Sequence, residues 1–165
     1  MTTQASDRDH ARQPNLFTDD YLLYLLARAS HIVSGEFHDR LKNLGVSVPQ
    51  WRVLAVLSGC ESATIGELAR KCLHKQPTLT RIVDRLERQG LVTRVAGSRD
   101  RRQIAVSLTE DGRRRSADLV AAAKTHEQSL FAAHPDRDIE ALKATLLDFI
   151  HVHQVENTAD QPHVG

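Results

Sequence analysis

The chain is poor in the residues on which several classes of protein depend. Only 4% of its 165 residues are aromatic, which is few for the stacking platforms that bind single-stranded nucleic acid. Its two cysteines, Cys60 and Cys72, cannot form a disulfide framework and suit a reducing cytosol. The longest apolar run, residues 21–27, is too short to cross a bilayer, and the polar N-terminus shows no secretory signal. We therefore expect a cytoplasmic protein with no membrane partner.

The chain also lacks the motifs of common enzymes. Its eight glycines are spread along the chain, where we expect turns, and none builds a loop that could cradle phosphate. Neither G-x-S-x-G nor H-E-x-x-H occurs, and no acid/base constellation stands out. Two histidine pairs could bind a metal, His31 with His38 and His151 with His153. Neither pair has the additional cysteine or carboxylate ligands that define a metal site. The sequence predicts a protein that is not an enzyme, with no cofactor and no bound metal.

What the chain does have is positive charge gathered in one segment. Residues 70–115 hold thirteen Lys/Arg against five Asp/Glu, a net charge of +8, whereas the whole chain carries only +1. The remaining residues therefore sum to −7, so a pI of about 7.9 hides a basic surface attached to an acidic body. Concentrated positive charge is typical of polyanion binders, although a solvated charged face gives the same count.

Apolar periodicity predicts a mainly helical chain. A spacing of about 3.6 residues predicts a long first helix from Thr18 to Gly45. Turn and capping residues predict five further helices, which start at Pro49, Thr64, Pro77, Thr109 and near Ile139. Alternating residues predict two strands, 91–95 and 104–108, around a turn at 97–100.

These elements together predict a fold that is mainly α with a small β-hairpin, a winged helix-turn-helix. We assign residues 46–109 to this DNA-binding domain and residues 18–45 with 110–155 to flanking dimerisation helices. Residues 1–17 and 156–165 are polar, and we expect them to be flexible tails.

The helix predicted from Pro77 has one side for the core and an opposite side for DNA. Its apolar positions follow i, i+3, i+4 and i+7, while Arg81 and Arg88 point away from them. The candidates for major-groove contact are Gln76, Pro77, Thr78, Thr80, Arg81 and Arg85. An ordinary amphipathic surface helix would show the same pattern.

Three arginines crowd the turn between the predicted strands. Arg99, Arg101 and Arg102 repel one another there, and such a tip can enter a minor groove with enhanced negative potential. Asp100 could hold one guanidinium in a fixed rotamer by a bidentate pair and so aim it at DNA. Simple charge balancing at an exposed turn is the alternative reading of Asp100.

The stretch from Asp100 to Thr109 (DRRQIAVSLT) resembles the MarR family of transcriptional regulators, since it fits that family's D-x-R-x5-L-T wing signature without a mismatch. Residues 49–54 and 79–91 are also similar to the family's second and recognition helices, and the likeness covers about residues 18–155. The resemblance implies a homodimer that binds double-stranded, pseudo-palindromic operator DNA, often as a repressor, and is released by a small ligand or oxidant. It also implies that Arg102 is the minor-groove arginine, that Asp100 orients it, and that Gln76 to Arg81 enter the major groove.

The end helices carry more apolar surface than a small winged helix can cover. The residues concerned are Leu22, Leu25, Leu26, Ala29 and Val33 on the first helix and Leu142, Leu146, Phe149, Ile150 and Val152 on the last. One recognition helix reads only a few base pairs, and two-fold pairing would place two such helices one turn of DNA apart. We expect a homodimer, with packing inside one chain as the alternative.

The effector is the part that the sequence determines least. His31, Trp51 and Arg52 are candidates for binding a planar aromatic molecule such as a phenolic acid, although a tryptophan such as Trp51 more often packs in the core. Alternatives are a regulator that senses oxidants through Cys60 or Cys72, or metals through histidines, and a winged-helix module that binds an acidic protein. The peroxide-sensing branch of the resembled family keeps its thiol in the first helix, where this chain has none.

Overall fold

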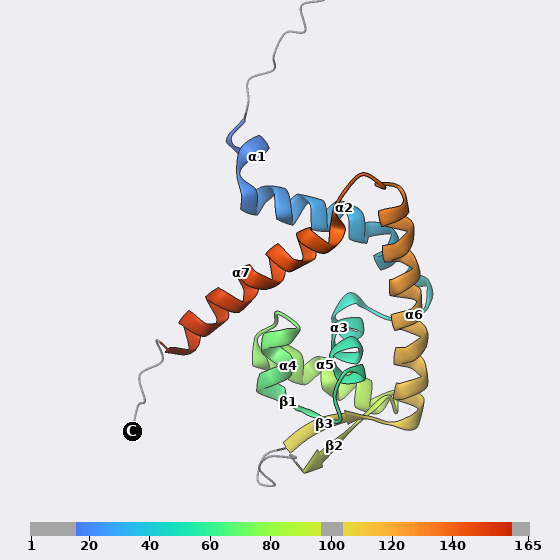
Figure 1. Ribbon diagram of the computed structural model, residues 1–165. Coiled ribbons are helices and arrows are strands. Elements are labelled where there is room, and N and C mark those ends of the chain that lie inside the picture. The colour runs from blue at the N-terminus through green and yellow to red at the C-terminus, as the bar shows by residue number, and fades with distance from the viewer. Residues whose placement is uncertain (1–15, 97–103, 160–165) are drawn as a thin grey trace, which may run out of the picture. The chain divides into compact units, whose positions relative to one another are not determined.

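The computed structural model describes residues 16–96 and 104–159, with side chains as far as residue 153 (Figure 1). The elements in chain order are α1 (Phe17–Asp20), α2 (Leu22–Asn43), α3 (Val48–Ser58), β1 (Ala63–Thr64), α4 (Ile65–Lys71), α5 (Gln76–Arg88), β2 (Val92–Ala96), β3 (Ile104–Leu108), α6 (Glu110–Ala132) and α7 (Ile139–Ala159). The chain divides into two compact units, the first ending at Leu119 and the second starting at Val120. The predicted fold class, mainly helical with a small β-hairpin, is confirmed.

A three-stranded antiparallel sheet lies at one end of helices α3 to α5, in the strand order β1-β3-β2 (Figure 1). Strands β2 and β3 are the predicted hairpin, with Val92 opposite Leu108 and Arg94 opposite Val106. Strand β1 was not predicted, because two residues carry no alternation and their partner β3 lies beyond two helices in the chain. The sheet therefore fixes the hairpin to the same body as α3, α4 and α5.

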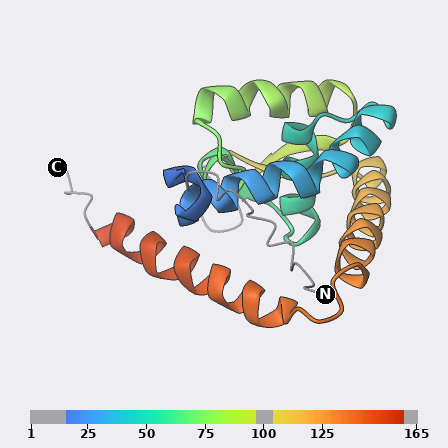
Figure 2. The ribbon, with the colours of Figure 1, turned by 90° about the horizontal axis from the view of Figure 1, so that it is seen from above.

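The core of the first unit is built from the apolar faces of its helices and the sheet. Its most deeply buried side chains are Leu41, Val53, Leu54, Leu57, Leu68, Cys72, Leu79, Val83, Leu86, Val92, Val106 and Leu119. Helix α5 contributes Leu79, Val83 and Leu86 to this core, as its periodicity predicts. In Figure 2, α5 lies at the outer edge of this unit, so its other side is left open by the unit's own elements.

Capping residues explain where several helices begin. Thr64 and Glu67 form the predicted capping box of α4, and the Thr109 hydroxyl accepts from the Gly112 amide at 3.0 Å at the start of α6. Ser47 and Gln50 form a second capping box at α3, which places Pro49 in its first turn. That box was not predicted, although the S-x-x-Q spacing that signals it is present in the sequence.

The predicted first helix differs from the structure at its start. Thr18 lies inside the short helix α1, and the chain breaks at Tyr21, where ψ is 110°, before α2 begins. The Phe17 and Tyr21 rings stack at 4.8 Å across this break. No glycine or proline marks the break, and the apolar period continues through it, so the sequence predicted one helix instead of two.

The second unit holds the end of α6 and helix α7. Figure 1 shows α7 as an unbroken helix. The Lys143 ammonium pairs with Glu127 at 3.4 Å and Glu140 at 3.3 Å, and lies 5.2 Å from the centre of the Phe131 ring. Helix α7 continues to Ala159, past the limit of 155 assigned from the sequence. In the described residues we find no helix with the length and apolar content needed to span a bilayer.

Candidate nucleic-acid interface

A tight turn places α5 against α4. Leu73 takes a left-handed conformation with φ of 59°, and the His74 amide donates to the Ala69 carbonyl at 2.9 Å. The Leu73 side chain is 79% exposed, so it adds little to the core and its conformation serves the reversal of the chain. Two short helices joined in this way form the helix-turn-helix that the sequence predicts.

The first turn of α5 is open to an anion. Its N-cap residue, Lys75, makes no side-chain capping bond, and Gln76, Pro77 and Thr78 are all exposed. Backbone N–H groups at such a helix end have no intrahelical acceptor, and the helix dipole favours negative charge there. Lys75 adds a formal positive charge. The start of α5 can therefore receive a phosphate oxygen.

The exposed side of α5 carries arginines that no described carboxylate neutralises. Arg81 and Arg85 are exposed, and within the described ranges neither forms an ion pair. They lie opposite the buried side formed by Leu79, Val83 and Leu86. Two guanidinium groups held on one rigid helix can reach base edges or phosphates of a duplex.

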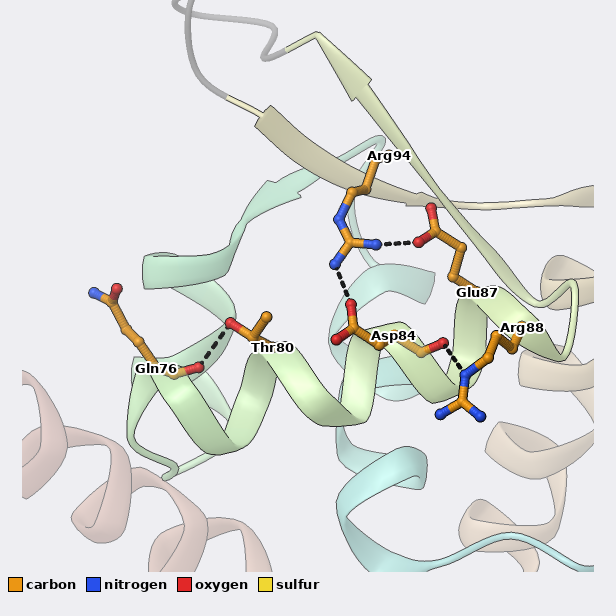
Figure 3. A network of polar contacts seen from close by, with 6 residues as sticks. All are labelled: Gln76, Thr80, Asp84, Glu87, Arg88 and Arg94. Carbon is orange, nitrogen blue, oxygen red and sulfur yellow. Dashed lines mark hydrogen bonds and ion pairs between the residues drawn. The ribbon is translucent and has the colours of Figure 1, made fainter.

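Thr80 differs from the other candidates on α5. Its side chain is half-buried, and its hydroxyl donates to the Gln76 carbonyl at 3.0 Å (Figure 3). This intrahelical bond uses the hydroxyl proton, so the Thr80 oxygen is left to act as an acceptor. Exposed Gln76, in contrast, keeps its side-chain amide directed away from the helix in Figure 3.

One arginine of the basic segment is paired inside the fold. Arg94 on β2 reaches across to α5, where its guanidinium bonds Asp84 at 2.5 Å and also Glu87 (Figure 3). The hydrogen bond that Arg94 donates to Asp84 and the charges of both carboxylates raise the pKa of Arg94 above its usual value, against a smaller opposing effect of burial. Arg94 therefore does not belong to the charge offered to a polyanion.

The segment between β2 and β3 holds the remaining predicted contacts. Arg99, Asp100, Arg101 and Arg102 lie outside the described residues, so their roles stay predictions from the sequence. Strands β2 and β3, on either side of this segment, are antiparallel neighbours in the sheet.

The effector candidates Trp51 and Arg52 have different partners in the first unit. The Trp51 ring packs edge-on against Phe37, with ring centres 5.4 Å apart, whereas the neighbouring Arg52 donates to the Cys72 carbonyl at 3.5 Å. His31 is exposed on α2, more than one helical turn before Phe37. A shallow hollow of about 370 Å³ lies nearby, lined by His38, Asp39, Lys42, Gly45, Val46, Ser47 and Val48. Trp51 and Arg52 thus make different contacts, and none of the three candidates lines the hollow.

The two cysteines lie in contrasting environments. Cys72 is buried at the end of α4, and burial raises the pKa of its thiol, with a smaller lowering effect from Arg52. Cys60 is exposed, and its thiol lies 3.4 Å from the Val56 carbonyl. A raised pKa keeps Cys72 protonated and weakly nucleophilic, so burial disfavours an oxidant-sensing role for this residue. Among the described residues, no group of three or more His, Cys, Asp or Glu gathers as a metal site would require.

Comparison with known proteins gives a consistent picture. The model of the MarR family matches residues 44–103. The organic hydroperoxide resistance transcriptional regulator of Bacillus subtilis (strain 168) is 32% identical over 94 residues, which cover 57% of this chain and 64% of that protein. The chain thus spans slightly less than two thirds of the length of this curated relative.

Solved structures extend the likeness over most of the chain. CouR from Rhodococcus jostii RHA1, solved with bound p-coumaroyl-CoA, is 26% identical with a TM-score of 0.71, over 80% of this chain and 93% of CouR. A MarR family transcriptional regulator from Silicibacter pomeroyi DSS-3 is 44% identical with a TM-score of 0.74, over 82% of this chain and 98% of that structure. With the helix-turn-helix and hairpin described above, this likeness shows that the chain belongs to the MarR family of winged-helix transcriptional regulators.

Proposed function

We propose that this chain is a homodimeric, sequence-specific DNA-binding repressor that a small aromatic acid releases from its operator. The observation that carries the proposal is the open side of α5, where Arg81 and Arg85 stand exposed and unpaired with described residues. The start of the same helix has no side-chain cap, so its backbone N–H groups can donate to a phosphate. Gln76, Pro77, Thr78 and Thr80 would line the major groove, and Arg102, oriented by Asp100, would enter the minor groove.

Exposed apolar side chains support the homodimer. Large apolar residues remain exposed from α1 through α2 (Phe17, Tyr21 between the helices, Leu22, Leu23, Tyr24, Leu25 and Ile32) and on α7 (Leu142, Leu147, Phe149, Ile150 and Val152). So many large exposed apolar side chains on a helix mark an interface more often than a solvated surface. Two-fold association would pair two α5 helices with two half-sites of a palindrome. Sedimentation equilibrium tests this directly, and a species that stays monomeric at micromolar concentration would contradict the homodimer.

Selection from a random duplex pool tests the DNA-binding function. We expect the wild-type protein to enrich a pseudo-palindromic sequence and to bind it at least about a thousandfold more tightly than random duplex. The logarithm of affinity should fall steeply with the logarithm of salt concentration, because basic side chains release counterions from phosphates. Equal weak binding to every duplex would instead favour a winged-helix module that binds an acidic protein.

Support for an effector that is an aromatic acid or its thioester comes from CouR, which was solved with p-coumaroyl-CoA, while His31, Trp51 and Arg52 on α2 and α3 stay the candidate residues from the sequence. Trp51 is the only tryptophan of the chain, so its fluorescence reports on its own surroundings. Titration with p-coumarate and with p-coumaroyl-CoA should change this fluorescence and release the enriched duplex over the same concentration range. Peroxide and divalent metals, tested in parallel, separate the redox and metal alternatives.

A further inference from the structure

Arg94 occupies a strand position that ordinarily holds an apolar side chain. Alternation along β2 places Arg94 on the same face as Val92, which is 2% exposed, and its partner on β3 is the buried Val106. The Arg94 side chain is itself only 31% exposed. Burying a charged group in such a place costs free energy unless neighbouring groups pair with it. Arg94 therefore needs its partners in order to occupy this face.

The partners of Arg94 come from the helix that would read DNA. Asp84 and Glu87 are three residues apart on α5, which places both on the side of the helix that faces β2 (Figure 3). One terminal nitrogen of the guanidinium bonds Asp84 at 2.5 Å and the other bonds Glu87. Since the guanidinium is rigid and planar, two bonds to two separate carboxylates fix its direction. The strand is thus held to α5 by a directional contact as well as by apolar packing.

We propose that Arg94 is a positioning residue for DNA recognition, which holds the β2–β3 hairpin at one angle to α5 so that both meet the duplex as one unit. This inference rests on the DNA-binding function proposed above. Pairing of β3 with β1 fixes the base of the hairpin, but apolar packing has no preferred direction, so without the tether small shifts of β2 on α5 meet less resistance. Reversing each such shift on binding would cost free energy and so lower the affinity for DNA. A surface that already has the bound geometry avoids this cost.

A second effect of the pairing must be separated from the first. Arg94 partly cancels the charges of Asp84 and Glu87, which would otherwise repel phosphates near α5. Charge acts alike on every duplex, because all duplexes carry the same phosphates, whereas geometry acts on the preferred sequence. The ratio of affinities for the enriched duplex and for random duplex therefore reports on positioning alone.

Two variants change charge in opposite directions while both remove the ion pairs that form the tether. Arg94→Gln lowers the net charge by one, and Asp84→Asn with Glu87→Gln raises it by two. We expect the affinity ratio to fall by about tenfold in both, which corresponds to the coupling of one side-chain network. Random-duplex affinity should fall in the first variant and rise in the second. A ratio that stays unchanged in either folded variant would overturn the positioning role.

Arg113→Gln serves as the charge-matched control. Arg113 lies exposed on α6 and pairs only with Glu110 of its own helix among the described residues, at 3.5 Å, so its loss removes one positive charge without touching the tether. We expect an affinity ratio like that of wild type. Arg94→Lys retains the charge but cannot span two carboxylates with a rigid fork, so its ratio should lie between those of wild type and Arg94→Gln.

Hydrogen exchange without DNA keeps this inference distinct from the proposed function. Amides of Val92–Ala96 and Ile104–Leu108 should exchange faster in the tether variants than in Arg113→Gln. The exchange rates of the α3 amides should be the same in all of these variants. Faster exchange with no enriched duplex would reject the DNA-binding proposal while the tether stands. Unchanged exchange together with an unchanged affinity ratio would reject the tether. If Arg94→Gln does not fold, the Arg94→Lys and double carboxamide variants carry the same comparison.

Discussion

The start of α6 is packed so closely on the chain that follows α5 that one added methyl group should be measurable. A Cβ atom at Gly112 would lie 1.8 Å from the Leu91 carbonyl oxygen and 2.9 Å from its carbon. The Thr109 amide donates to the same Leu91 carbonyl at 3.2 Å, and the Thr109 hydroxyl donates to the Gly90 carbonyl at 2.6 Å. Gly112→Ala must therefore displace backbone that connects α5 to β2.

The magnitude follows from the size of that displacement. Moving the new atom from 1.8 Å to the 3.4 Å at which ordinary contact begins takes about 1.6 Å. Overpacking of a rigid site costs about 1–3 kcal/mol, and the upper end applies here because the obstacle is backbone. Alanine recovers at most about 1 kcal/mol of helix propensity relative to glycine. The free energy of unfolding should therefore fall by about 2 kcal/mol.

Gly35→Ala is the matched control for this measurement. Gly35 lies inside α2, and a Cβ atom built there meets nothing within 4 Å in the described residues, so only the propensity gain of about 1 kcal/mol remains. Urea unfolding at one fixed protein concentration compares the two variants. With a slope near 2 kcal/mol/M, we expect the midpoint of Gly112→Ala about 1 M below wild type. A midpoint equal to or above that of wild type would refute the close packing of α6 on Leu91.

Further predictions concern DNA contacts and thiols. Arg81→Ala should weaken binding to the enriched duplex by about 1–3 kcal/mol in an anisotropy titration, and a phosphate role would also reduce the salt slope by about one. Arg102→Ala should cost a similar amount, and an unchanged affinity would remove that residue from recognition. Asp100→Ala should weaken the enriched duplex more than random duplex, whereas equal losses would argue against an aiming role. At pH 8, a thiol-specific disulfide reagent should modify Cys60 quickly and Cys72 only after unfolding in urea, because burial raises the pKa of Cys72; fast modification of both in the folded protein would contradict this.

The helices with strong local signals were predicted within a few residues. Thr64 with Glu67, Pro77 and Thr109 mark helix starts through bonds or backbone angles that depend only on near neighbours. The break at Tyr21 has no such local signal and was predicted wrongly. Strand β1 exists only because β3 comes alongside it, so no window of the sequence around residues 63–64 could indicate it.

In the basic segment too, the sequence predicted some features of the candidate site and only the structure showed others. Counting charges treated Arg94 and Arg81 alike, since both are arginines among residues 70–115. In the structure Arg94 is paired with Asp84 and Glu87, whereas Arg81 is exposed without an ion pair to described residues. Likewise Trp51 and Arg52 are adjacent in sequence, yet they face Phe37 and the Cys72 carbonyl respectively. Neighbours on a helix point about 100° apart, so adjacency in sequence did not make a shared pocket.

Composition, helix periods and the D-x-R-x5-L-T pattern by themselves determined the fold class and the family, because each depends on residue type and spacing along the chain. Which charges remain available to a partner was decided only by tertiary structure. A side chain's partner across a helix and a strand depends on how those elements pack, and Coulomb energy depends on that distance rather than on sequence separation. The pairing of Arg94 with α5 is therefore a property of the folded chain that its charge pattern does not contain.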